Sequence, residues 1–194
     1  MKADLPPIAL EGVAKRYGAV QAVRDVSFTL PQGARAALVG HNGAGKTTLM
    51  KLMLGLARPS AGRILMLGHD PAAVLAELRR HIGWLPENVS FNPALTGREV
   101  LRFFARLKGE STSAADAMLD RVGLGAAARQ RIGTYSKGTR QRLGLAQALI
   151  GAPRALLLDE PTTGLDPEVR QDLYDTLAGL ADAGTTVLLS SHAL

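Results

Sequence analysis

The sequence predicts an α/β fold built around a mostly parallel β-sheet. Short β-like runs alternate with helical stretches along most of the 194 residues, as in chains that form parallel sheets. Several of these runs are apolar without alternation, which is typical of strands covered on both faces. At residues 35–56 a strand-like run, a glycine-rich loop and a helical stretch follow one another directly. The length fits one domain.

The predicted strands are short and apolar. They cover residues 8–10, 26–30, 35–39, 63–67, 82–85, 156–158 and 185–189. Between the predicted strands at 82–85 and 156–158, the periodicity of apolar residues indicates helices only, at about 100–107, 114–122 and 136–150. We therefore expect a core formed by residues 1–86 and 152–194, with an α-helical insert at about 87–151.

The composition is that of a globular protein and excludes several kinds of site. Apolar residues make up 46% of the chain and charged residues 21%. Because there is no cysteine, disulfide scaffolds, cysteine-based zinc ribbons, iron–sulfur clusters and cysteine nucleophiles are excluded. The longest apolar runs are far shorter than the roughly 20 residues of a membrane span, and the first residues lack an apolar signal core. We expect a soluble, cytosolic chain.

Charge is distributed unevenly along the sequence. The net charge is +6, yet the part from Ala155 onward carries one basic and seven acidic residues, so the remainder is strongly basic. A basic surface suits nucleic acid, acidic lipid headgroups or polyphosphate ligands. An arginine-rich, solvated surface without a ligand explains the charge equally simply.

The glycine-rich segment Gly40–Thr47 matches the phosphate-loop pattern of two glycines, a lysine and a hydroxyl residue at fixed spacing. Glycines allow backbone N–H groups to surround an anion, and the following helix adds its dipole. Lys46 would neutralise the β- and γ-phosphates of ATP, and the hydroxyl of Thr47 would hold Mg²⁺. The residues expected around the nucleotide are Gly40, Asn42, Gly43, Ala44, Gly45, Lys46, Thr47 and Thr48.

A second candidate element is the apolar strand 156–158, which ends in Asp159 and Glu160. Ligands of parallel α/β sheets bind at the carboxyl ends of the strands. Asp159 would bind the hydration shell of Mg²⁺, and Glu160 would orient or deprotonate the attacking water. A strand that simply runs into an acidic turn is the structural alternative.

The segment Tyr135–Arg142, placed shortly before the acidic strand, resembles the signature motif of ABC-type ATPases. This resemblance covers nearly the whole chain and implies a P-loop NTPase fold with a mostly parallel core sheet, an N-terminal antiparallel β part and an α-helical insert. It places Tyr17 at the adenine-stacking position, Glu87 in the loop that usually carries glutamine, Asp166 in the D-loop and His192 at the switch histidine. Taken alone, Tyr17 also fits a packing residue.

In that family two ATPase units face each other, with ATP between the phosphate loop of one copy and the signature of the other. The resemblance implies that Ser136, Gly138 and Asp166 contact the nucleotide of a second copy. It also implies catalytic roles for Lys46, Glu160 and His192, and Mg²⁺ ligands at Thr47, Glu87 and Asp159. From their local pattern alone, Ser136 and Asp166 are helix N-caps.

Three positions differ from the usual family pattern. Lys137 and Thr139 stand where the signature normally has glycine and glutamine, and Glu87 replaces a glutamine. Lys137 either strengthens anion binding or is a solvated charge. Glu87 keeps an oxygen ligand and adds a negative charge.

The resemblance implies an ATPase that powers an integral membrane permease in a separate chain, located on the inner face of the cell membrane. Segments 86–89, 97–99, 104–109, 135–150 and 171–174 are similar to the ATPase of the ABC complex that matures the copper site of nitrous oxide reductase, which implies a periplasmic copper-handling partner. The alternatives are an ABC exporter of drugs, lipids or ions and a non-transport ABC ATPase acting on DNA or ribosomes. A nucleic acid partner is not expected, because the coiled-coil or second ATPase segments usual in such proteins are missing.

The sequence stops two residues after His192, where members of the family continue with further strands and helices. We therefore expect that the chain is a fragment, truncated at its C-terminal end, which folds poorly or hydrolyses ATP weakly on its own.

Overall fold

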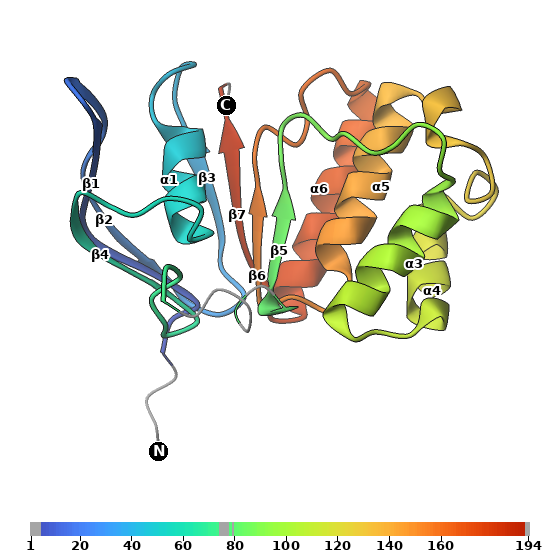
Figure 1. Cartoon of the computed structure of the whole chain (residues 1–194), viewed down its shortest axis with the longest axis horizontal. Helices are drawn as coiled ribbons and strands as arrows, with labels where there is room; N and C mark the ends of the chain where they lie inside the picture. Colours follow the sequence, from blue (N-terminus) through green and yellow to red (C-terminus); the bar gives the residue numbers. More distant parts are fainter. Residues whose placement is uncertain (1–4, 74–77, 79, 193–194) are drawn as a thin grey trace.

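The computed structural model describes residues 5–73, 78 and 80–192. Its central element is a parallel sheet of order β3-β7-β6-β5 (Figure 1). The strand Ala155–Leu158 is fully buried and entirely aliphatic, as expected for a strand that is covered on both faces. The four strands of this sheet are β3 (Arg35–Val39), β5 (Ile82–Leu85), β6 (Ala155–Leu158) and β7 (Thr186–Ser191). The parallel sheet confirms the predicted fold class.

A smaller antiparallel sheet of order β2-β1-β4 lies on one side of the parallel sheet, with helix α1 between them (Figure 1). Its strands are β1 (Ile8–Tyr17), β2 (Val20–Leu30) and β4 (Ala61–Met66). The first two are longer than predicted, because the pairing register shifts after Leu10, next to Gly12 with a φ of +56°. Such a bulge breaks the alternation of apolar and polar residues on which the prediction depended.

The helices lie on both faces of the parallel sheet. Helix α1 packs between the two sheets and buries Met50 and Met53 completely, while α5 and α6 cover the opposite face (Figure 1). Helices α3, α4 and α5 share a third apolar cluster farther out. Their bounds are α1 (Lys46–Met53), α3 (Gly97–Lys108), α4 (Thr112–Arg121), the 3-10 turn η1 (Ile132–Thr134), α5 (Lys137–Leu149) and α6 (Pro167–Asp182).

Helix α5 belongs to two packing clusters. On one side it contacts α3 and α4 through Leu143 and Ala146, and on the other it packs on the sheet through Leu145 and Leu149. The predicted helical insert therefore shares one of its helices with the core, and α5 is the rigid connection between the two.

The apolar stripe of α3 divides between the interior and the surface. Val100 and Leu101 are buried in the helical cluster, whereas Phe103 and Leu107 are 53% and 62% exposed. The helix begins at a capping box in which the Thr96 side chain accepts a hydrogen bond from the Glu99 backbone, and Glu99 accepts one from the Thr96 backbone. One face of α3 is thus fixed by packing, and the adjacent face remains open to solvent.

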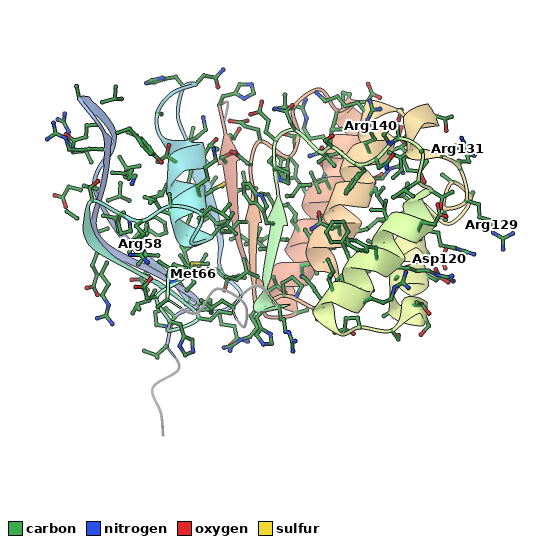
Figure 2. All side chains as sticks on the ribbon, in the orientation of Figure 1. Arg58, Met66, Asp120, Arg129, Arg131 and Arg140 are labelled. Atoms are coloured by element: carbon green, nitrogen blue, oxygen red, sulfur yellow. The ribbon has the colours of Figure 1, made fainter. Side chains whose placement is uncertain are left out.

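Several arginines lie at the outer end of the helical region. Figure 2 shows Arg129 and Arg131 on this side of the molecule, far from the antiparallel sheet.

Within the described part of the chain, no helix has the length and apolar character that a bilayer span requires.

Candidate functional site

The carboxyl ends of three neighbouring strands bring the candidate site residues together. The glycine-rich loop follows β3, Asp159 and Glu160 follow β6, and His192 follows β7. These strands are in parallel register, with Val39 opposite Ser191 and Leu158 opposite Leu189. Segments that are more than a hundred residues apart in the sequence therefore meet at one edge of the sheet.

The loop 40–45 turns through glycine conformations that other residues rarely adopt. Gly43 and Gly45 have φ values of +84° and +90°. A Cβ at Gly45 would also overlap the backbone oxygen of Ala22 in β2, so only glycine fits there. Helix α1 then begins at Lys46, with Thr48 in its first turn, without a side-chain cap or an acidic residue. Its free N–H groups and dipole therefore suit an anionic ligand.

Thr47 and Asp159 are joined by a direct hydrogen bond. The Thr47 hydroxyl donates to Asp159 Oδ2 at 2.7 Å, and the Ser190 hydroxyl donates to Asp159 Oδ1 at 2.6 Å. Asp159 and Ser190 are only 2% and 1% exposed. Both carboxylate oxygens are thus oriented by hydroxyl groups, and the carboxylate is held beside the start of α1.

Glu160 lies at the centre of the site. Its carboxylate accepts a hydrogen bond from His192 Nδ1 at 2.7 Å and pairs with Lys46 Nζ at 3.2 Å. Burial by itself raises the pKa of Glu160, but the interactions with His192 and Lys46 outweigh it and hold that pKa below its ordinary value. Glu160 is therefore an ionised carboxylate at neutral pH, as a general base must be.

These residues have the donor set that Mg²⁺ prefers. Mg²⁺ is bound in phosphate sites by one or two protein oxygens together with phosphate oxygens and water, and the Thr47 hydroxyl and Asp159 carboxylate already lie in contact. The same carboxylate is buried, which is costly for a charge unless a cation or hydrogen bonds offset it. Thr47 and Asp159 therefore fit a magnesium ion.

The signature segment forms the exposed start of α5. The Ser136 hydroxyl accepts a hydrogen bond from the Thr139 backbone at 3.1 Å, which confirms the predicted N-cap, and the Thr139 hydroxyl lies 2.8 Å from it. The Lys137 side chain extends to the loop that follows β6. Its Nζ lies so close to Gly164 that a Cβ at that position would overlap it. Gly138 lies against Leu165 in the same loop. The signature and the loop 160–166 thus form one continuous surface.

Asp166 differs in part from its prediction. It stands at the N-cap position of α6, as expected, but its side chain accepts no hydrogen bond from that helix. Pro167 follows directly and has no N–H to donate. The exposed carboxylate of Asp166 is left available for another partner.

Tyr17 and Glu87 stand apart from the carboxylate cluster. Tyr17 ends β1, is 51% exposed, and pairs with Val20 near the β2 residue that contacts Gly45. Glu87 follows β5 at the same edge of the sheet as Asp159. Within residues 5–73, 78 and 80–192, Glu87 makes no hydrogen bond or ion pair, and the structure does not join it to Asp159.

Two polar residues of the site were missed by the sequence reasoning. Ser190 donates to Asp159 and accepts from the Glu160 backbone N–H at 2.8 Å, so it fixes both acidic residues. Gln141 in α5 is buried and donates to the Pro161 carbonyl at 3.1 Å. The only signal for Ser190 was a hydroxyl residue within the apolar run before His192. For Gln141, its place in the signature segment was known from the sequence, but nothing there indicated a role for its side chain.

The comparisons with known proteins agree with this geometry. Residues 23–163 match the sequence pattern of the family described as ABC transporter. An uncharacterized ABC transporter ATP-binding protein of Bacillus subtilis, YdbJ, is 38% identical over 97% of this chain and 62% of its own length. The daunorubicin resistance ATP-binding protein DrrA3 of Streptomyces coeruleorubidus is 40% identical over 96% of this chain and 60% of its own length.

The chain therefore spans less than two thirds of the length of these relatives. A solved structure, described as the ATP binding subunit of an ABC transporter, superposes with a TM-score of 0.87 at 30% sequence identity and covers 96% of this chain and 80% of its own. The phosphate loop, the signature helix and the acidic strand end follow one another along this shared fold, in the order expected from the sequence. This chain belongs to the ABC transporter family and has the P-loop fold of that family's ATP-binding subunit.

Proposed function

We propose that this chain binds ATP with Mg²⁺ and hydrolyses it. The observation that carries the proposal is the hydrogen-bonded network of Thr47, Asp159, Ser190 and Glu160 beside the uncapped start of α1. It places an anion site, a pair of Mg²⁺ oxygen ligands and an ionised base at one edge of the sheet. That is the set of groups that phosphoryl transfer to water requires.

Each group of the network has a chemical role in this proposal. Backbone N–H groups of loop 40–45 and the ammonium of Lys46 bind the phosphates. Thr47 and Asp159 hold Mg²⁺, which, when bound, neutralises charge on the β- and γ-phosphates. Glu160 takes a proton from the water whose oxygen attacks the terminal phosphorus, and the bond from that phosphorus to ADP breaks. His192 keeps the Glu160 carboxylate oriented by its hydrogen bond.

Lys46 changes partners in this scheme. In the structure its Nζ donates to the carbonyls of Gly40 and His41 and pairs with Glu160. A triphosphate competes for the same ammonium, because phosphate oxygens carry more negative charge than a carbonyl. Transfer of Lys46 to the phosphates leaves Glu160 with His192 alone and frees one carboxylate oxygen for water.

A second copy of the chain completes the site. The exposed Ser136 and Asp166 and the half-buried Gly138 lie on the surface formed by α5 and the loop 160–166, and in the described part of the chain none of them is hydrogen-bonded to the phosphate loop of its own copy. The N-terminus of α5 has no acidic residue in its first turn, so its dipole favours the γ-phosphate of a partner's ATP. Lys137 adds a positive charge at that point. Glu87 remains a candidate Mg²⁺ or water ligand that nucleotide binding would recruit.

The energy of hydrolysis would drive an integral membrane permease in a separate chain, at the inner face of the cell membrane. Phe103 and Leu107 of α3 offer an exposed apolar face for helices of that permease. The names of relatives favour an exporter of small molecules, because DrrA3 is a daunorubicin resistance protein. Maturation of the copper site of nitrous oxide reductase, with a periplasmic copper-handling partner, is the second candidate and is supported by the sequence segments 86–89 and 135–150.

The decisive experiment separates nucleotide binding from turnover. Glu160→Gln keeps the shape of the side chain but cannot act as a base, so we expect ATP binding to persist, hydrolysis to fall about a thousandfold, and a dimer to accumulate with ATP in analytical ultracentrifugation. Lys46→Ala serves as the contrast, because it should weaken ATP binding itself in calorimetry. Hydrolysis by Glu160→Gln near the wild-type rate would rule out Glu160 as the general base.

A further inference from the structure

Lys15 lies over the aromatic ring of Tyr17. Its Nζ is 4.8 Å from the ring centroid, within the range of a cation–π contact. The two residues are separated by one position in β1, and their side chains meet although the pairing register shifts between Lys15 and Arg16. The same ammonium donates a hydrogen bond of 2.7 Å to the backbone carbonyl of Arg58. Lys15 therefore connects the Tyr17 ring to a second segment of the chain.

The segment that receives Lys15 is itself fixed to β1. The Ser60 backbone N–H donates to the Ala14 carbonyl at 2.8 Å, and the Arg16 backbone N–H donates to the Ser60 hydroxyl at 3.1 Å. Arg58, labelled in Figure 2, lies in the chain that enters the antiparallel sheet. Because Ser60, two residues after Arg58, is hydrogen-bonded to β1 at both Ala14 and Arg16, the Arg58 carbonyl lies on a segment that is attached to the same strand as Lys15.

The end of the β1–β2 hairpin lies close to the phosphate loop. Tyr17 pairs with Val20 where the two strands meet, and Ala22 in β2 has its carbonyl against Gly45. The ring is half exposed and makes no packing contact in the apolar clusters of the described residues. A planar ring in this position, with one face taken by a cation, has one face left for a ligand.

We propose that Lys15 is a positioning residue that orients the Tyr17 ring so that its free face receives the base of the nucleotide. This inference rests on the proposed function, since it assigns a role within the same ATP site. The ammonium is attracted by the negative face of the ring and is held in place by the Arg58 carbonyl. The ring is thereby fixed before the nucleotide arrives, which reduces the entropy lost when a base stacks on it.

The test compares a ligand that has a base with one that has none. Binding of ATP with Mg²⁺ and of inorganic tripolyphosphate with Mg²⁺ is measured by calorimetry for the wild-type full chain and for Lys15→Met and Lys15→Arg. We expect Lys15→Met to weaken ATP binding about threefold, the size of an exposed cation–π contact, and to leave tripolyphosphate binding unchanged. Lys15→Arg keeps a cation over the ring and should bind ATP as the wild type does.

A double-mutant cycle with Tyr17→Ala separates orientation of the ring from a general effect of charge. In the Tyr17→Ala background, Lys15→Met should have no further effect on ATP binding. Equal weakening of ATP and tripolyphosphate, an unchanged or tighter affinity of Lys15→Met for ATP, or additive effects in the cycle would each overturn the proposal. If the wild type bound neither ligand, the proposed function itself would fail, and that outcome is distinct from these three.

Discussion

At residue 160 the backbone takes a left-handed conformation, with a φ of +47°, that side-chain-bearing residues adopt only where their surroundings hold them. Glu160 has such support, because its N–H is bound by the Ser190 hydroxyl and its carboxylate by His192 and Lys46. The backbone therefore directs the glutamate into the site at an energetic cost that these neighbours offset. Ser190 is essential to the arrangement, since one hydroxyl serves both Glu160 and Asp159.

Replacement of Ser190 tests this arrangement directly. Ser190→Ala leaves the buried N–H of Glu160 without a partner and one oxygen of Asp159 without a donor. We expect a loss of about 1–3 kcal/mol in the free energy of unfolding, measured with urea. ATPase activity should fall about tenfold or more, because Glu160, the proposed general base, is no longer held in position. Ser113→Ala, an exposed change in α4, should leave both quantities at wild-type values, and a wild-type rate for Ser190→Ala would contradict the role of Ser190.

At the scale of single elements, the sequence predicted the strands of the parallel sheet better than those of the antiparallel sheet. The bounds of β3 and β5 agree with the prediction, because their apolar residues form uninterrupted runs. The exposed ends of β1 and β2 were missed, since Lys15 and Arg16 carry no apolar signal and the bulge near Gly12 shifts the pattern. Hydrogen bonding to a neighbouring strand, which a single strand's sequence does not encode, sets those bounds.

Helix α3 shows the same division between burial and exposure. Its periodicity predicted one apolar stripe, yet Val100 and Leu101 are buried in the helical cluster, whereas Phe103 and Leu107 are exposed. We expect the double variant Phe103→Ser, Leu107→Ser to keep the wild-type free energy of unfolding within about 0.5 kcal/mol and to lose co-purification with the membrane permease from detergent extracts. Leu101→Ser, a buried change on the same helix, should instead cost about 2–5 kcal/mol. Retained co-purification of the double variant would show that this face is not the docking surface.

At the scale of the whole molecule, the sequence predicted that Asp159 and Glu160 end a strand at the carboxyl edge of a parallel sheet. The structure has loop 40–45 and His192 at that same edge, because parallel strands all point their carboxyl ends to the same side. The hydrogen bonds that connect those segments could not be predicted, because Ser190 and Gln141 acquire their partners only through tertiary packing. The structure therefore adds the connections between motifs whose presence the sequence already indicated.

Gln141 provides such a connection between the signature helix and the loop 160–166. Its buried amide donates from α5 to the Pro161 carbonyl, one residue after Glu160. Gln141→Met keeps the volume but removes the donor, and we expect a loss of about 1–2 kcal/mol in the free energy of unfolding. The affinity of a single copy for ADP should not change, because the phosphate loop is untouched, whereas the rate of ATP hydrolysis should fall.

The control for that variant is Gln171→Met, the same substitution on the exposed surface of α6, where the amide contacts only Asp175 one turn away. It should leave both stability and turnover unchanged. If Gln141→Met hydrolysed ATP at the wild-type rate, the hydrogen bond to Pro161 would be a packing detail and not a connection between the signature and the base. A fall in turnover with unchanged ADP binding would instead show that this hydrogen bond supports hydrolysis at Glu160, because no other described side chain of α5 donates a hydrogen bond to the loop 160–166.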